Sequence, residues 1–134
     1  MQQPEECSSV REELEALLGS VEGLSQIFIS DKDGVPIMHA SSTRGGAPSE
    51  GQLRPQLLTS YSAALEQTAK MELGQQRCMV CFYQGHQLLV FNAFPLAVTA
   101  ISQSTANTGL VLALAPKLRA LADTVGRIVK PALP

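Results

Sequence analysis

Residues 78–92 read CMVCFYQGHQLLVFN, and this stretch decides the fold class. Two runs of strand-forming residues, 78–83 and 86–92, flank Gln84-Gly85, which indicates a tight hairpin turn. Both runs are apolar on successive residues, whereas a sheet with one face in water would alternate apolar and polar positions. We therefore expect helices to cover both faces of the sheet.

Three further segments predict strands. Residues 24–30 and 35–41 flank an Asp33-Gly34 turn and predict a second hairpin. Pro36 near the start of its strand favours an edge position, because proline cannot donate to a ladder. Residues 96–103 predict the fifth strand of one sheet.

Helical spacing of apolar residues predicts three helices. The first begins at Ser9, which forms a capping box with Glu12. The second begins near Pro55 and ends near Gly74. The third includes Pro116, so it either bends there or begins there after a short extended piece. Asn107 is a candidate cap for this last helix.

The predicted order is α-ββ-α-βββ-α, an α/β three-layer sandwich with a largely antiparallel five-stranded sheet. A chain of 134 residues has room for one such domain, which we place at residues 9–134 after a flexible tail at 1–8. The start of the chain is polar and acidic, and no apolar run approaches the roughly 20 residues of a membrane span. The sequence therefore predicts a cytosolic protein that reaches membranes only through partners.

Charged residues make up 16% of the chain, against roughly 25% in an average soluble domain. A small protein with so few charges is expected to have part of its surface covered by a partner or a ligand. The net charge of −2 gives no reason to expect binding to nucleic acid.

No pattern in the sequence predicts an enzyme, a cofactor or a metal site. Cys78 and Cys81 match C-x-x-C, but they lie within a predicted strand, where residues three apart point to opposite faces. Residues 31–34, DKDG, lack the later ligands of a calcium loop. His39 and His86 have no nucleophile motif beside them, so structural roles are favoured for both.

The stripe on the second predicted helix is the feature most open to a functional interpretation. With three helices for two sheet faces, one face has only this helix, and some apolar area should remain uncovered. The stripe either packs on its own sheet alone or also contacts a partner, together with the strand at 78–83 if that strand lies at an edge. The stripe residues are Leu57, Leu58, Tyr61, Ala64, Leu65 and Thr68.

Four segments resemble the roadblock/dynein light chain superfamily, and within it the family of mitogen-activated protein kinase scaffold subunits of Ragulator (LAMTOR) complexes. They are SVEGL (20–24), SDKDGVPI (30–37), QLLVFN (87–92) with Pro95-Leu96, and STANTGL (104–110). The likeness extends over residues 20–114 in the same order and spacing. It does not extend to the residues before Ser9, the loop at 42–51 or Pro116.

The resemblance implies a non-enzymatic subunit that forms a heterodimer with a sister roadblock subunit through its second helix and third strand. It also implies a lipidated Ragulator subunit that holds the pair on late endosomes and lysosomes, recruitment of Rag GTPases for TORC1 activation by amino acids, and scaffolding of MEK and ERK. The implied interface joins the stripe residues to Cys78, Met79, Val80, Cys81, Phe82 and Tyr83.

Three alternatives stay open at this point. The chain could be a small-ligand sensor, a roadblock-type regulator of a small GTPase outside Ragulator, or a thiol oxidoreductase that uses Cys78 and Cys81. The sequence does not indicate which surface binds kinases or GTPases.

Overall fold

The computed structural model describes residues 3–31, 33–42 and 55–129. Five antiparallel strands form one sheet in the order β2-β1-β5-β4-β3. The elements, in chain order, are α1 (Gln3–Ser20), β1 (Leu24–Asp31), β2 (Pro36–Ser41), α2 (Pro55–Ala69), β3 (Cys78–Phe82), β4 (His86–Ala93), β5 (Leu96–Gln103), α3 (Thr108–Leu112) and α4 (Ala115–Val129).

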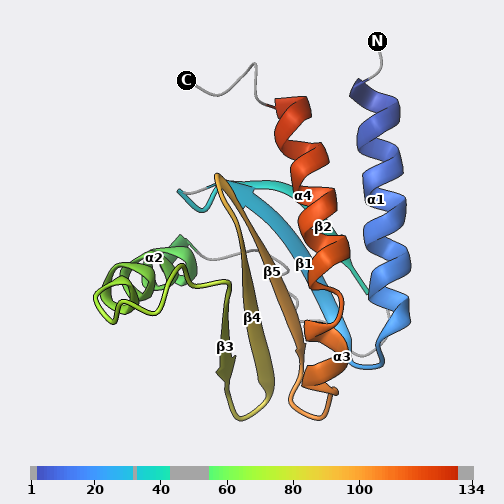
Figure 1. The fold of residues 1–134 in the computed structure, drawn as a ribbon. Helices are drawn as coiled ribbons and strands as arrows, with labels where there is room; N and C mark the ends of the chain where they lie inside the picture. The colour runs from blue at the N-terminus through green and yellow to red at the C-terminus, as the bar shows by residue number, and fades with distance from the viewer. Residues whose placement is uncertain (1–2, 32, 43–54, 130–134) are drawn as a thin grey trace.

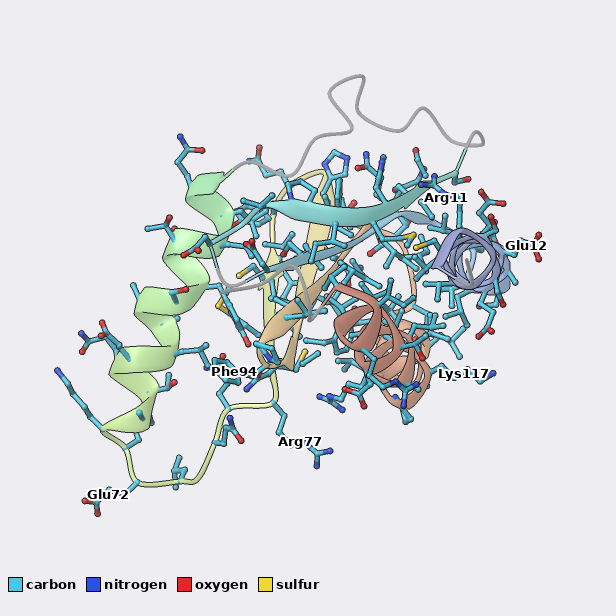
Figure 2. The ribbon with its side chains drawn as sticks, turned by 90° about the horizontal axis from the view of Figure 1, so that it is seen from above. Arg11, Glu12, Glu72, Arg77, Phe94 and Lys117 are labelled. Atoms are coloured by element: carbon cyan, nitrogen blue, oxygen red, sulfur yellow. The ribbon has the colours of Figure 1, made fainter. Side chains whose placement is uncertain are left out.

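The helices cover the two faces of the sheet unequally. Helices α1 and α4 lie side by side against one face, which we call the first face (Figure 1). Helix α2 lies on the opposite side, on the second face, as Figures 1 and 2 both show. The predicted three-layer sandwich is confirmed, and so are the edge positions of β2 and β3.

The first face carries a continuous apolar core. Strand residues of odd number in β1 and β4 point into it, among them Ile29, Leu89 and Phe91. Leu14 of α1 and Leu118 of α4 pack against them, and none of these side chains is exposed to solvent. Two helices with apolar stripes therefore complete this face from within the chain.

The second face carries a smaller apolar cluster under α2. Its buried members are Phe28, Leu58, Tyr61, Leu88, Val90 and Ala97. The expectation that strand surface would remain uncovered here is wrong for the centre of the face, because Phe28 and Val90 are almost completely buried. The exposed apolar side chains of this half of the molecule lie instead along β3 and in the turn that precedes it.

Three sequence-based expectations about boundaries need correction, and the structure decides between the two options at Pro116. Helix α1 begins at Gln3, so Ser9 lies inside the helix and residues 3–8 are helical. Helix α2 ends at Ala69, five residues before Gly74. A short helix, α3, precedes α4 where an extended piece was one option. Pro116 is the second residue of α4, so the helix begins there and does not bend. The expected loop at 42–51 lies outside the described residues after Ser42.

Two of the family-like segments meet at one end of the sheet. Gly23 has a φ of +91°, which favours glycine. A Cβ placed on it would also lie only 3.0 Å from the Cβ of Ala106, so both the backbone conformation and the close approach require glycine here. The Gln103 amide donates to the Gly23 carbonyl at 2.8 Å. Asn107 caps α3, as predicted, by accepting a hydrogen bond from the amide of Leu110.

The Gln87 side chain, on β4, fixes the loop formed by residues 103–108 through hydrogen bonds. Its buried side-chain nitrogen lies 2.9–3.3 Å from the carbonyl oxygens of residues 103, 104 and 106, and it donates to them. Its side-chain oxygen accepts from the Thr108 hydroxyl. The Gln87 side chain therefore ties β4 to residues 103–108, and the Gln103 carbonyl also accepts from the Ala106 amide at 3.0 Å.

Candidate interaction surface

Helix α2 and strand β3 supply the residues that the sequence analysis placed at a partner interface. Leu57 and Leu65 of α2 pack on the same cluster as Met79 and Cys81 of β3. The structure thus brings the two predicted segments together on the second face. We call this region, residues 57–68 with 78–83, the α2–β3 surface.

The predicted residues differ in how much of each side chain is available. Leu58 is only 3% exposed and Tyr61 only 4%, so both fill the chain's own core. Leu57, Ala64, Leu65 and Thr68 are half-buried and lie along the flank of the same stripe. The stripe therefore packs on its own sheet and still presents a flank to solvent.

Strand β3 is an open edge of the sheet. Among the described strands it pairs with β4 alone. The ladder ends where the Asn92 amide donates to the Arg77 carbonyl and the Tyr83 amide donates to the His86 carbonyl. In an antiparallel ladder the inward and outward main-chain groups alternate. The amides and carbonyls of Cys78, Val80 and Phe82 therefore point to the open edge, where they can pair with another strand.

The structure adds apolar residues that the sequence analysis did not select. Met71 and Leu73, in the turn between α2 and β3, are exposed. Phe82 and Tyr83 at the end of β3, which were among the predicted interface residues, are exposed as well. Met71 and Leu73 alternate with charged or small residues in the stretch KMELG (70–74), which resembles an ordinary turn. The only signal for them is an apolar pair in a polar turn.

The cysteines and histidines take structural positions. Cys78 packs toward the first face and Cys81 toward the second, so the two thiols cannot meet. Burial raises the pKa of the Cys78 thiol, the opposite of the shift that activates a nucleophile. The His39 ring stacks on Phe28 with ring centres 4.4 Å apart, and His86 is exposed at the start of β4. Among the described residues, no group of three His, Cys, Asp or Glu side chains could hold a metal ion.

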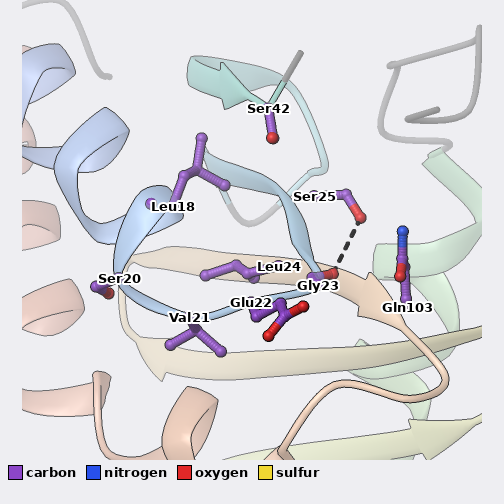
Figure 3. A pocket seen from close by; sticks show the side chains of 10 residues that line it. Leu18, Ser20, Val21, Glu22, Gly23, Leu24, Ser25, Ser42 and Gln103 are labelled. Carbon is purple, nitrogen blue, oxygen red and sulfur yellow. Dashed lines mark hydrogen bonds between the residues drawn. The ribbon is translucent and has the colours of Figure 1, made fainter. Parts of the chain in front are cut away.

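A hollow of about 610 Å³ lies where α1 leads into β1 (Figure 3). Glu22, Ser25 and Gln103 are among its lining residues, and the Ser25 hydroxyl donates to the Gly23 carbonyl at 3.4 Å. The lining holds one carboxylate and no cationic side chain. Leu18, Val21 and Leu24 contribute apolar side chains to the same lining, and this mixture does not point to one class of ligand.

Within residues 3–31, 33–42 and 55–129, no helix is both long enough and apolar enough to cross a bilayer.

Comparison with known proteins shows a close relationship to one family. The family model described as "Mitogen-activated protein kinase kinase 1 interacting" matches residues 8–129. The chain is 39% identical over 113 residues to the Ragulator complex protein LAMTOR3 of Pongo abelii and 38% identical to that of Homo sapiens. Each alignment covers 84% of this chain and 89% of the relative.

Solved structures share the fold at lower identity. A structure described as "MglB with tetrameric arrangement" is 22% identical with a TM-score of 0.68, and the match covers 99% of this chain and 94% of that one. The Roadblock/LC7 domain from Streptomyces avermitilis is 15% identical with a TM-score of 0.54, covering 90% and 94%. These likenesses confirm the roadblock architecture that the resemblance implied.

Proposed function

The chain belongs to the mitogen-activated protein kinase kinase 1 interacting family, and on this basis we propose that it pairs with a sister roadblock subunit through its α2–β3 surface. It is a non-enzymatic scaffold or adaptor of roadblock fold. The observation that carries the proposed pairing is the open edge of β3, flanked by exposed Phe82 and Tyr83 and by the half-buried flank of α2.

Two kinds of interaction are available to a partner at this surface. The outward main-chain groups of β3 can extend the sheet into a second subunit, which supplies hydrogen bonds with little dependence on side-chain identity. The half-buried flank of α2 and the exposed side chains of Met71 and Leu73 supply apolar area. Aromatic and methionine side chains are enriched at the centres of protein interfaces, which supports this assignment.

We further propose that the pair works within a Ragulator-like complex, because relatives with 38–39% identity are named as Ragulator subunits. In that role a lipidated subunit would hold it on the cytoplasmic face of late endosomes and lysosomes. The pair would support recruitment of Rag GTPases and activation of TORC1 by amino acids. The family description supports contact with the kinase MEK. We propose ERK as the second scaffolded kinase, as the resemblance implies.

Leu65→Asp tests whether α2 takes part in pairing. A carboxylate at this half-buried position would have to be desolvated in the complex, at a cost of several kcal/mol, so we expect affinity for the sister subunit to fall about 1000-fold or more. Co-expression followed by size-exclusion chromatography with light scattering reads out the complex. Leu112→Asp on α3 is the matched control and should pair normally. A Leu65→Asp chain that pairs with unchanged affinity would remove α2 from the interface.

Val80→Pro tests strand addition separately. The Val80 amide points to the open edge, so proline removes a donor to the partner while the ladder to β4 keeps its hydrogen bonds. We expect weaker pairing with a folded chain, and Val80→Thr, which keeps the amide, should pair normally. Equal affinity of the two variants would show that β3 does not pair with a partner strand.

A further inference from the structure

A basic surface with an aromatic centre lies at the end of the sheet where β4 turns into β5. Phe94, at this turn, is 76% exposed, and its main-chain amide is held by the Asn92 side-chain oxygen at 3.1 Å. Arg77 and Arg119 line a hollow of about 390 Å³ beside Phe94. Figure 2 shows Arg77 and Phe94 on the same side of the molecule, between α2 and α4. With Arg127, we call these residues the arginine patch.

A second hollow of about 550 Å³ adjoins the first, since Asp123 and Ala93 line both. Its lining includes Pro95, Leu96 and Gly126, with Arg127 at its rim. A Cβ at Gly126 would lie 3.7 Å from the Cδ1 atom of Leu96, so the glycine keeps this apolar floor accessible. The two hollows together place an apolar recess next to cationic side chains.

The charges of the patch are unbalanced. Three guanidinium groups face a single carboxylate, that of Asp123, and no ion pair joins them within the part of the chain that the structure describes. The Arg77 side chain has no hydrogen bond to any described residue. Among the described residues, the Arg127 side chain donates only to the Thr124 hydroxyl, at 3.3 Å. Two cations are thus open to an acidic ligand.

Arg119 gives the patch a fixed shape. Its Nε donates to the Asn92 carbonyl at 3.2 Å and its Nη2 donates to the Arg77 carbonyl at 3.0 Å. A guanidinium has five N–H donors in a rigid plane, so further donors remain for a ligand in the hollow. Because both acceptors are main-chain atoms at the ends of β3 and β4, α4 is tied to the sheet here.

We propose that the arginine patch is a docking site for an acidic segment of a partner protein, with an apolar side chain of that segment in the recess beside Phe94. Arginine binds carboxylates through paired, charge-assisted hydrogen bonds, and arginine and aromatic residues dominate binding energy at interfaces. Asp123 within the patch and the chain's net charge of −2 disfavour a polyphosphate backbone or an anionic membrane as the ligand.

Most of this site lies outside the proposed pairing surface. Phe94 and Arg127 are not part of the α2–β3 surface. Arg77 adjoins that surface one residue before β3, and Arg119 lies near enough for its charge to act on Tyr61 and Cys78. A subunit paired through β3 would therefore keep most of the patch open to a further component. Loss of pairing and loss of docking are separable outcomes.

The probe is the acetylated peptide Glu-Glu-Leu-Glu-Glu-Leu-Glu-Glu, titrated into the 15N-labelled full-length chain in complex with its sister subunit. We expect amide shifts in residues 92–96 and 119–127 and a Kd below about 1 mM, weakened at high salt. The matched peptide with Gln for every Glu should not bind in this range. The double variant Arg77→Glu/Arg127→Glu should lower affinity about tenfold or more, since each exposed ion pair contributes up to about 1 kcal/mol.

Two further variants separate docking from folding. Phe94→Ala should weaken binding of the Glu peptide, whereas Leu110→Ala, which truncates an exposed apolar side chain on α3 outside both surfaces, should leave peptide binding unchanged. All variants should keep the spectrum of the folded chain. The proposal is overturned if the Glu peptide causes no shifts up to about 1 mM, or if the Gln peptide binds equally well. Tighter binding to vesicles containing about a quarter phosphatidylserine would assign the patch to lipid instead.

Discussion

The two faces of one sheet have been completed in different ways. On the first face, α1 and α4 enclose a continuous apolar core in which Leu14, Phe91 and Leu118 are fully buried. On the second face, α2 is the single helix among the described residues, and it contributes Leu58 and Tyr61 to a cluster of six buried residues. The neighbouring edge strand β3 ends in exposed aromatic side chains. The same strands therefore have a fully enclosed apolar core on the first face and a partly exposed apolar surface on the second face.

Buried polar atoms follow the same division. Gln87, on the first face, uses both ends of its amide in hydrogen bonds. On the second face, polar atoms of five side chains are buried without a partner among the described residues: Gln26, Ser30, His39, Tyr61 and Thr99. On the first face the Ser102 hydroxyl is likewise buried without a partner among these residues. Each unsatisfied group costs about 1–3 kcal/mol, so more of this cost falls on the second face than on the first. We infer that the second face is the less stable one and the one that a partner can most improve.

Matched leucine truncations give the largest expected contrast. Leu118→Ala should lower the free energy of unfolding by about 4 kcal/mol, because it leaves a cavity in the two-helix core. Leu58→Ala should cost less, about 2–3 kcal/mol, since its surroundings on the second face collapse more easily. Urea unfolding of the isolated chain measures both. Equal losses would show that the two faces are equally well packed.

Gln87→Leu tests whether polar satisfaction contributes to the stability of the first face. The substitution keeps the volume but removes the side-chain donor to the carbonyls of residues 104 and 106 and one of two donors to the carbonyl of residue 103. We expect a loss of about 2–3 kcal/mol in unfolding free energy. Thr108→Val, which removes one hydrogen bond of the same network, should cost about 1 kcal/mol. Hydrogen exchange of the Gly109 and Leu110 amides would then show whether α3 loosens first.

The fold was largely predictable because apolar patterning and turn chemistry agree along most of the chain. Residues 96–103 were predicted as a strand and form β5 with the same bounds. The start of α1 was not predictable from its cap, since the Ser9–Glu12 signature lies inside a longer helix. Cys7 and Val10 pack on the first-face core, and this tertiary contact favours helix beyond the local signal.

The apolar stripe of the candidate interface was predictable from the sequence, but the burial of each of its residues was not. Helical periodicity identifies which side of α2 is apolar, and it cannot distinguish Leu58, in the chain's own core, from Leu65 on the exposed flank. Met71 and Leu73 have no periodicity to reveal them because they lie in a turn. The arginine patch joins residues 77, 94, 119 and 127, which only the folded chain brings together.

Tyr61→Phe tests whether an unsatisfied polar group lowers the stability of the second face. The buried Tyr61 hydroxyl has no hydrogen-bond partner among the described residues, and burial raises its pKa, so it is neutral and unsatisfied. Its removal should stabilise the isolated chain by about 1 kcal/mol. Thermal unfolding of the isolated chain measures this. A loss of stability would instead show that the hydroxyl is satisfied in solution and that the second face is better completed than the structure indicates.

His39 gives the smallest effect and one that depends on pH. Burial, and then the nearby charge of Arg11, lower the pKa of His39 below its usual value near 6.5. As pH falls below about 6.5, the unfolded chain takes up this proton before the folded chain does, so stability decreases until the lower, folded pKa is reached. The melting temperature should therefore fall between about pH 7 and 5.5.

The Arg11→Gln variant should show a smaller fall, because one cause of the shift is removed. His39→Phe keeps a ring stacked on Phe28 and should abolish this contribution altogether. Both variants act on the second face, since His39 projects from β2 toward the side of the sheet that α2 covers. If the wild type and His39→Phe lose stability in parallel on acidification, titration of this face does not contribute, and the acid sensitivity belongs to groups elsewhere in the chain.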